Sequence, residues 1–333
     1  MVLAPLFLLA AAATFEESFR AGLLALQRND LTAARTGLES ASKTAPGNAR
    51  VWVALAQTYR KLGDSRKAVA AAAKAEALGG KDAVVMSTLA MYFDEAGDPL
   101  RSADALAKYA ALVPANADAR EKAEAKYFAV AQSLLQQSKF SEALTILQAA
   151  TARLKDSAQL QLGLGVAAYG LRRFDEAATA FLRTIELNPE IPQPYMFLGK
   201  FLDQIPARVP DVAKKFIEFE KAHPEDFAGY YLHAKALNLQ AIEPEHAAEL
   251  LKKALALNDR EAGVHFELGA VFDRTRRYAE AAPEFERAAE LAPSDPATHY
   301  RLSRVYDRLG KSALAQQERD KHAVLEKAAR ESK

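Results

Sequence analysis

Residues 52–75 read WVALAQTYRKLGDSRKAVAAAAKA, and this stretch decides the fold. Aromatic, aliphatic and small residues return three or four positions apart, which places them on one face of a helix. The marker positions are Trp52, Leu55, Ala56, Tyr59, Gly63, Ala68 and Ala75. The pattern predicts two helices that pack closely through small residues, with Trp52 in the core between them.

The same pattern returns along almost the whole chain at intervals of 34 residues. The alanine that opens the second half of each copy shows the interval, from Ala34 to Ala68 and from Ala143 to Ala177. A recurrence of about 34 residues with this signature indicates an array of helical repeats. A later copy has its markers at His265, Leu268, Gly269, Phe272, Ala281, Phe285, Ala288 and Pro293.

On these markers the chain resembles the tetratricopeptide repeat (TPR) family over about residues 15–329. The resemblance implies an all-α, right-handed superhelical solenoid of about nine helix-turn-helix repeats, in which each repeat contacts its neighbours. Within an array at 14–329, the predicted repeats are 15–48, 49–82, 83–116, 124–157, 158–191, 192–225, 226–261, 262–295 and 296–329, followed by a polar tail at 330–333.

Three places depart from the regular period. Residues 117–123 fall outside it and predict a lengthened helix or loop. Pro206 and Pro210 interrupt the sixth repeat, and Pro244 interrupts the seventh. Proline lacks an amide donor and disfavours helix in the residue before it, so we expect a widened turn in both repeats.

Residues 1–13 predict a signal peptide that is cleaved near Ala13. The apolar run from Val2 to Ala13 has the length of a signal core, ends in three alanines, and is too short for a stable membrane span. It lacks a preceding Lys or Arg, so an apolar helix that caps the first repeat is the alternative. The prediction is export to the periplasm or outside a bacterial cell, with a cytoplasmic location as the alternative.

Composition and motifs argue against catalysis and nucleic-acid binding. The 44 basic and 43 acidic residues give a net charge of +1, which offers no general basic surface for phosphates. The chain has no cysteine, and its six histidines form no zinc motif. His265 and His299 lie 34 residues apart and are expected to replace the aromatic residue at Trp52. We therefore predict no enzyme activity, no cofactor, no metal site and no nucleic-acid partner.

The TPR resemblance implies that the first helix of each repeat lines a concave groove. A groove with an apolar centre and basic ends suits a peptide with acidic flanks. The alternative is that the aromatic residues only pack between helices and the arginines are ordinary surface residues. The candidate groove residues are Arg20, Gln57, Arg60 and Lys61 near the start, Phe128, Gln132, Leu162, Val166 and Phe197 in the middle, and Phe266, Tyr300, Arg301, Arg304 and Arg308 near the end.

The sequence thus predicts a non-enzymatic scaffold or adaptor that binds a peptide or protein segment, and it leaves the oligomeric state open. The carboxylate clamp of some TPR proteins is absent, since Val53 and Gln57 stand where its first Lys and Asn would be expected. Two alternatives stay open: a dedicated subunit of a secretion or envelope assembly machine or regulator of an enzyme partner, and an enzyme whose site is built from repeat side chains.

Overall fold

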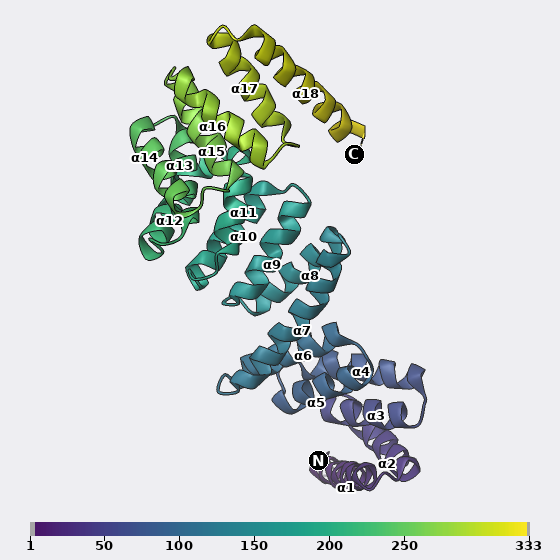
Figure 1. Cartoon of the computed structure of the whole chain (residues 1–333). Helices are drawn as coiled ribbons and strands as arrows, with labels where there is room; N and C mark the ends of the chain where they lie inside the picture. The colour runs from purple at the N-terminus through teal and green to yellow at the C-terminus, as the bar shows by residue number, and fades with distance from the viewer. Residues whose placement is uncertain (1–3, 332–333) are drawn as a thin grey trace. The chain divides into compact units, whose positions relative to one another are not determined.

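The computed structural model describes residues 4–331, with side-chain positions from Thr14 onward, and within that range it is helical without strands. The helices form nine successive pairs, as expected for an all-α TPR solenoid (Figure 1). Their bounds are α1 (Ala4–Gln27), α2 (Leu31–Thr44), α3 (Ala49–Lys61), α4 (Ser65–Gly79), α5 (Ala83–Glu95), α6 (Pro99–Leu112), α7 (Ala117–Gln136), α8 (Phe140–Arg153), α9 (Ala158–Gly170), α10 (Phe174–Leu187), α11 (Gln193–Lys200), α12 (Val209–Ala222), α13 (Phe227–Gln240), α14 (Pro244–Leu257), α15 (Ala262–Arg274), α16 (Tyr278–Leu291), α17 (Pro296–Arg308) and α18 (Ser312–Glu331).

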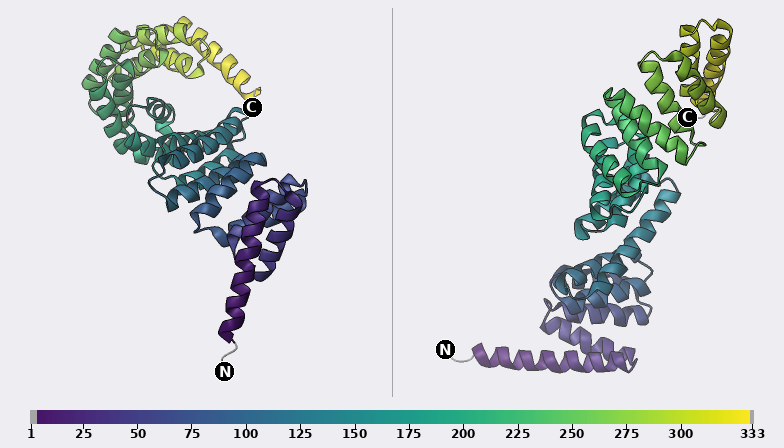
Figure 2. Two further views of the ribbon diagram at one scale, coloured as in Figure 1. Left: turned by 90° about the horizontal axis from the view of Figure 1, so that it is seen from below. Right: turned by 60° about the vertical axis from the view of Figure 1, so that its left-hand side comes forward.

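The chain divides into two compact bodies, an N-terminal body (Met1–Leu171) and a C-terminal body (Arg172–Lys333). Residues 1–3 of the predicted signal peptide and residues 332–333 of the predicted polar tail lie outside the described range. Helix α1 runs from Ala4 to Gln27 without a break. In the C-terminal body, α12 to α18 follow one another along a curved path (Figure 2).

Short turns join the two helices of a pair, and their sequence explains where the helices end. In most of these turns the middle residue has a positive φ, and it is glycine at Gly63, Gly97 and Gly310, with φ of 79°, 73° and 72°. Glycine has no Cβ and adopts this left-handed conformation without strain. Where aspartate follows this glycine it caps the next helix: Asp64 accepts the amide of Lys67 at 3.2 Å, and Asp98 accepts that of Arg101 at 3.1 Å.

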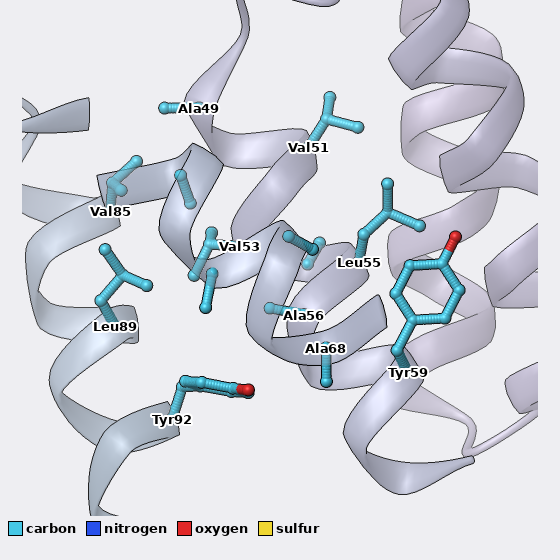
Figure 3. Close-up of a cluster of buried hydrophobic side chains, with 14 of the residues drawn as sticks. Ala49, Val51, Val53, Leu55, Ala56, Tyr59, Ala68, Val85, Leu89 and Tyr92 are labelled. Atoms are coloured by element: carbon cyan, nitrogen blue, oxygen red, sulfur yellow. The ribbon is translucent and has the colours of Figure 1, made fainter. Parts of the chain in front are cut away.

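The core of the N-terminal body forms where α3, α4 and α5 meet. Val53 of α3, Ala68 of α4 and Leu89 of α5 belong to one buried cluster (Figure 3). The side chains on α4 at this interface are alanines, so α4 approaches α3 and α5 closely. The larger side chains of α3 and α5 then fill the space between the three helices. The expectation that Trp52 lies in this core was wrong: its side chain is only partly buried and packs against the edge of the cluster.

Trp52 instead takes part in a hydrogen bond that recurs between repeats. Its indole Nε1 donates to the carbonyl of Pro46, six residues earlier, at 2.8 Å. The same bond joins other first helices to the loop before them: Tyr195 to Pro189 at 3.1 Å, Tyr230 to Pro224 at 3.1 Å, His265 Nε2 to Asp259 at 3.1 Å and His299 Nε2 to Pro293 at 3.0 Å. The prediction that His265 and His299 replace the aromatic residue is confirmed, because they make its hydrogen bond.

The core of the C-terminal body shows why small residues are needed in the signature. Phe285 and Ala281 of α16 are fully buried. A Cβ added to Gly269 of α15 would come within 3.0 Å of three carbons of the Phe285 ring. The close approach predicted for Gly269 and Ala281 is therefore present, and it makes room for the phenylalanine.

The structure agrees with two of the three irregularities that the sequence predicts and differs from it at the third. Residues 117–123 lengthen α7 to 20 residues, and the sixth repeat has an eight-residue α11 followed by two 3₁₀ turns, Leu202–Gln204 and Pro206–Arg208. The longer turn expected at Pro244 was wrong, because α14 begins at Pro244 after a connection of three residues, as in most other pairs, although here Ala241 and Glu243 have the positive φ in place of the middle residue. Proline at the first helical position has no amide to satisfy there. The extra residue lies in α13, which has 14 residues where α15 has 13.

Candidate protein-binding cleft

A cleft of about 1210 Å³ lies in the C-terminal body, on the side formed by the first helices of four successive repeats. Arg301, Arg304 and Arg308 face it from α17, while Leu302 and Tyr306 of the same helix are buried on the other side. Residues three and four apart share a helix face, which is why the three arginines form one row. The cleft is lined by Lys200, Asp203, Lys235, Asn238, Leu239, Phe266, Glu267, Ala270, Asp273, Arg274, Arg276, Tyr278, Asp295, Ala297, Arg301, Arg304 and Arg308.

The lining of the cleft is basic, although the whole chain is nearly neutral. Seven Lys and Arg residues line it against four Asp and Glu residues. Arg301 pairs with Asp273 at 3.5 Å, and Arg274 donates to the carbonyl of Asn238 at 2.6 Å. Within residues 4–331, neither Arg276 nor Arg308 has an ion pair, so both guanidinium groups are available to a bound anion.

One carboxyl group, Glu267, is almost fully buried at the base of this basic surface. Burial raises its pKa above the ordinary value, and Lys235, with its Nζ at 3.8 Å, and the Asn238 amide, at 2.6 Å, only partly oppose this. A raised pKa favours the neutral carboxyl, so Glu267 cancels less of the positive charge in the cleft than its formal charge suggests.

We expect Glu267→Gln to become more stable relative to the parent chain as the pH rises. In the folded parent the Glu267 carboxyl keeps its proton up to a higher pH than in the unfolded chain, where a glutamate has a pKa of about 4.3. The stability due to this group is therefore complete at low pH and is lost as pH rises through the raised pKa. Urea unfolding of both proteins at pH 4 and pH 8 measures the difference, and a gap that stays constant, or moves in favour of the parent, would contradict it.

The structure brings four of the predicted groove residues together and separates the others. Phe266, Arg301, Arg304 and Arg308 all line the cleft. Tyr300 is exposed and is not one of the residues that line the cleft. Its ring centroid lies 5.4 Å from that of His322 in α18.

The remaining aromatic and middle-chain candidates lie elsewhere. Phe197 packs on Phe181 of α10 with ring centroids 5.0 Å apart, and it is absent from the cleft lining. The other candidates of the middle region belong to the N-terminal body: Phe128, Leu162 and Val166 are half-buried, and Gln132 is exposed.

Near the start of the chain, the predicted residues are also outside the cleft. Arg20 lines a shallow hollow along α1, and Gln57 is half-buried on α3. Arg60 forms an ion pair with Glu95 of the next first helix, and Lys61 is exposed. The pairing of Arg60 favours a role in joining repeats over a role in binding.

Sequence reasoning missed several cations of the cleft, although a signal for them exists. The missed Lys200 and Lys235, like the predicted Arg304, each lie five residues after the aromatic residue or histidine that bonds the preceding loop. Arg274 and Arg308 are the last residues of α15 and α17. Comparing the position of Lys200 and Lys235 across the last four repeats would have found a cation in three of them, with Ala270 in the other.

Comparison with solved structures gives partial similarities. The chain is similar to MamA 41-end from Desulfovibrio magneticus RS-1, with 25% identity, a TM-score of 0.43, and coverage of 51% of this chain and 94% of the other. It is similar to TTC0263, a thermophilic TPR protein in Thermus thermophilus, with 26% identity, a TM-score of 0.43, and coverage of 50% and 90%. The APC/C hetero-tetramer Cut9-Hcn1 covers 93% of this chain and 94% of its own, at 12% identity and a TM-score of 0.49.

Among curated proteins, none matches this sequence at a significant level. None of the described helices is long and apolar enough to cross a membrane. The family model of the tetratricopeptide repeat matches residues 19–83, 128–192 and 239–296, which together make up more than half of the chain. Such repeats are protein-interaction elements, and this supports a protein-binding scaffold. On the period, the paired helices and this match, the chain belongs to the tetratricopeptide repeat family.

Proposed function

We propose that this chain is a non-enzymatic scaffold that binds a segment of a partner protein in the cleft of the C-terminal body. The segment carries carboxylates on both sides of an apolar residue. The observation that supports this is the combination of Phe266 with a row of cations, including Arg304 and Arg308, on one preformed surface. Solenoids of this kind use their extended inner surfaces for binding.

The two parts of the cleft contribute differently to binding. Phe266 is half-buried and lies edge-on to Phe285 with centroids 5.6 Å apart, and Leu239 and Ala270 line the same cleft. Its ring is already packed, so an apolar contact with a partner costs little side-chain conformational entropy. Arg304 and Arg308 are exposed, so each salt bridge to the partner is worth only about 0–1 kcal/mol. Together they steer acidic segments to the cleft and reject basic ones.

The histidine contacts favour a structural over a catalytic role. His265 Nδ1 lies 2.7 Å from Glu284, and His299 Nδ1 lies 2.5 Å from Glu318, at the same place in successive repeats. The other nitrogen of each ring contacts the loop carbonyl of the repeat before it. Both nitrogens are therefore engaged within the array, and the recurrence of the pair matches a packing function.

Binding of a short synthetic peptide tests this proposal. The probe has a Leu-Phe centre flanked by Asp and Glu, is acetylated and amidated at its ends, and carries a fluorophore for anisotropy. We expect Arg304→Glu/Arg308→Glu to weaken its binding by about tenfold or more, and a matched peptide with Lys flanks to bind much more weakly to the parent.

The control variant, Lys214→Glu/Lys327→Glu, changes the net charge equally at two exposed positions outside the cleft. It should bind the acidic peptide as the parent does. Equal binding of acidic and basic peptides, or an equal loss in both double variants, would contradict a cleft that selects acidic segments.

We further propose that the chain is exported and cleaved near Ala13. The support is the apolar run that ends in Ala11, Ala12 and Ala13. Expression of the full chain in a bacterium, followed by intact-mass measurement of the protein from the envelope and cytosolic fractions, tests this. A product that begins near Thr14 in the envelope fraction is expected. Uncleaved protein in the cytosol alone would favour a helix that caps the first repeat.

A further inference from the structure

A second hollow lies on the opposite side of α17 from the cleft. Its volume is about 740 Å³, and it lies between α16 and α18 with α17 as its floor. Ala289 and Pro293 line it from α16 and the loop after it, Leu302 lines it from α17, and Val324 and Leu325 line it from α18. Leu302 belongs to the buried face of α17, which is opposite the row of Arg301, Arg304 and Arg308.

A small residue in α16 makes the hollow wider. Ala289 is the twelfth residue of α16, and the residues at the same place in α14 and α10 are Leu255 and Ile185. Leu255 is half-buried and packs against the core, and Ile185 is buried. Alanine at this position leaves the volume of a larger side chain unfilled.

The length of α18 forms the other wall of the hollow. This helix has 20 residues, whereas α14 and α16 have 14 each. His322 fixes it to the start of α17 through a 2.9 Å contact between Nδ1 and the carbonyl of Pro296. Beyond His322, Leu325 lines the hollow and Val324 is 68% exposed at its edge. An apolar side chain so exposed marks a surface that could be covered.

The edge of the hollow is acidic. Glu286, Glu290 and Asp320 line it, whereas Glu318 is buried and pairs with the two basic lining residues, Lys321 at 2.8 Å and His299 at 2.5 Å. Arg287 pairs with Glu290 at 2.9 Å, but the carboxylates still outnumber both cations. An occupant with positive charges beside its apolar residues would complement this edge.

We propose that this hollow binds an amphipathic helix of a partner protein, with a large apolar side chain seated over Ala289 and Lys or Arg residues beside it. Two neighbouring helices with an apolar floor form the groove that such a helix enters. The cleft and this hollow have opposite charge and lie on opposite faces of α17. One chain therefore holds two chemically different segments without competition between them.

A designed peptide of Leu and Lys at amphipathic helical spacing, amidated and fluorescently labelled, is the probe for this site. We expect it to bind the 333-residue chain, and a matched peptide with Glu in place of Lys to bind far more weakly. Ala289→Leu places in the hollow the side chain that α14 already carries at this position, and should weaken binding by about tenfold or more. Ala289→Ser keeps the small size and should retain binding.

Two further variants separate this site from the cleft and from folding defects. Arg304→Glu/Arg308→Glu should leave binding of the Leu and Lys peptide intact. If Ala289→Leu lowers the thermal midpoint, Glu290→Lys gives a second test, since Glu290 is exposed on the edge and its reversal should weaken binding by a similar factor.

Unchanged binding in Ala289→Leu, or in Glu290→Lys where the leucine variant unfolds, would overturn the proposal. Equal affinity for the Lys and Glu peptides would overturn it too. The other possible occupant is a second copy of this chain, and sedimentation of the chain alone tests it. Self-association that Ala289→Leu abolishes would assign the hollow to that second copy, and not to a partner helix.

Discussion

Phe285→Ala is expected to lower the free energy of unfolding of the C-terminal body by about 3–5 kcal/mol. The ring of Phe285 is fully buried, lies against Gly269 and contacts Phe266. Gly269 has no side chain that could move into the space left by the ring, so most of the cavity would stay open. The loss should be local, because each repeat of a solenoid contacts only its neighbours.

Urea unfolding followed by circular dichroism measures this loss, and Leu257→Ala is the matched control. Leu257 is 48% exposed in the same body, and its truncation should cost less than about 0.5 kcal/mol. A cost below about 1 kcal/mol for Phe285→Ala would show that the eighth repeat closes around the missing ring, and would contradict the tight packing at Gly269.

Gly229→Leu is expected to destabilise the C-terminal body by about 3 kcal/mol, near the upper end for overpacking. A Cβ at Gly229 of α13 would lie 2.7 Å from the Cα and 3.1 Å from the amide nitrogen of Glu220 in α12. Backbone atoms cannot rotate away, so the two helices must separate. Replacing glycine by leucine, which has the higher helix propensity, stabilises α13 by only about 1 kcal/mol, and this does not offset the clash.

Gly80→Leu is the control for this substitution, because a Cβ at Gly80 meets nothing within 4 Å. Thermal unfolding of both variants beside the parent distinguishes them: the midpoint should fall clearly for Gly229→Leu and stay near the parent value for Gly80→Leu. Similar midpoints for the two variants would show that α12 and α13 can separate at little cost.

The fold could be predicted from the sequence because the same contacts recur in each repeat. Gly269, Ala281 and Phe285 occupy places where size alone decides whether two helices fit, and size is visible in the sequence. Trp52 shows the limit of this reasoning. A large aromatic residue suggested core, but the ring lies at the edge and serves as a hydrogen-bond donor.

The candidate cleft could be predicted only in part. Arg301, Arg304 and Arg308 follow one another on a single helix, so helical spacing was enough to group them. Lys200 and Lys235 were missed because they lie 35 residues apart, which is out of step with a strict 34-residue count, and because Ala270 stands at the equivalent place in the next repeat. Tyr300 was placed in the groove by the same spacing, yet its ring turns toward His322.

The hydrogen bond that α3, α11, α13, α15 and α17 each make to the loop before them bears on how such arrays change length. Deletion of residues 262–295, one whole repeat, would place His299 six residues after Asp259, where His265 now stands. Its Nε2 would then meet the Asp259 carbonyl in place of that of Pro293. The bond at this junction is therefore kept when the eighth repeat is lost or duplicated as a complete unit of 34 residues.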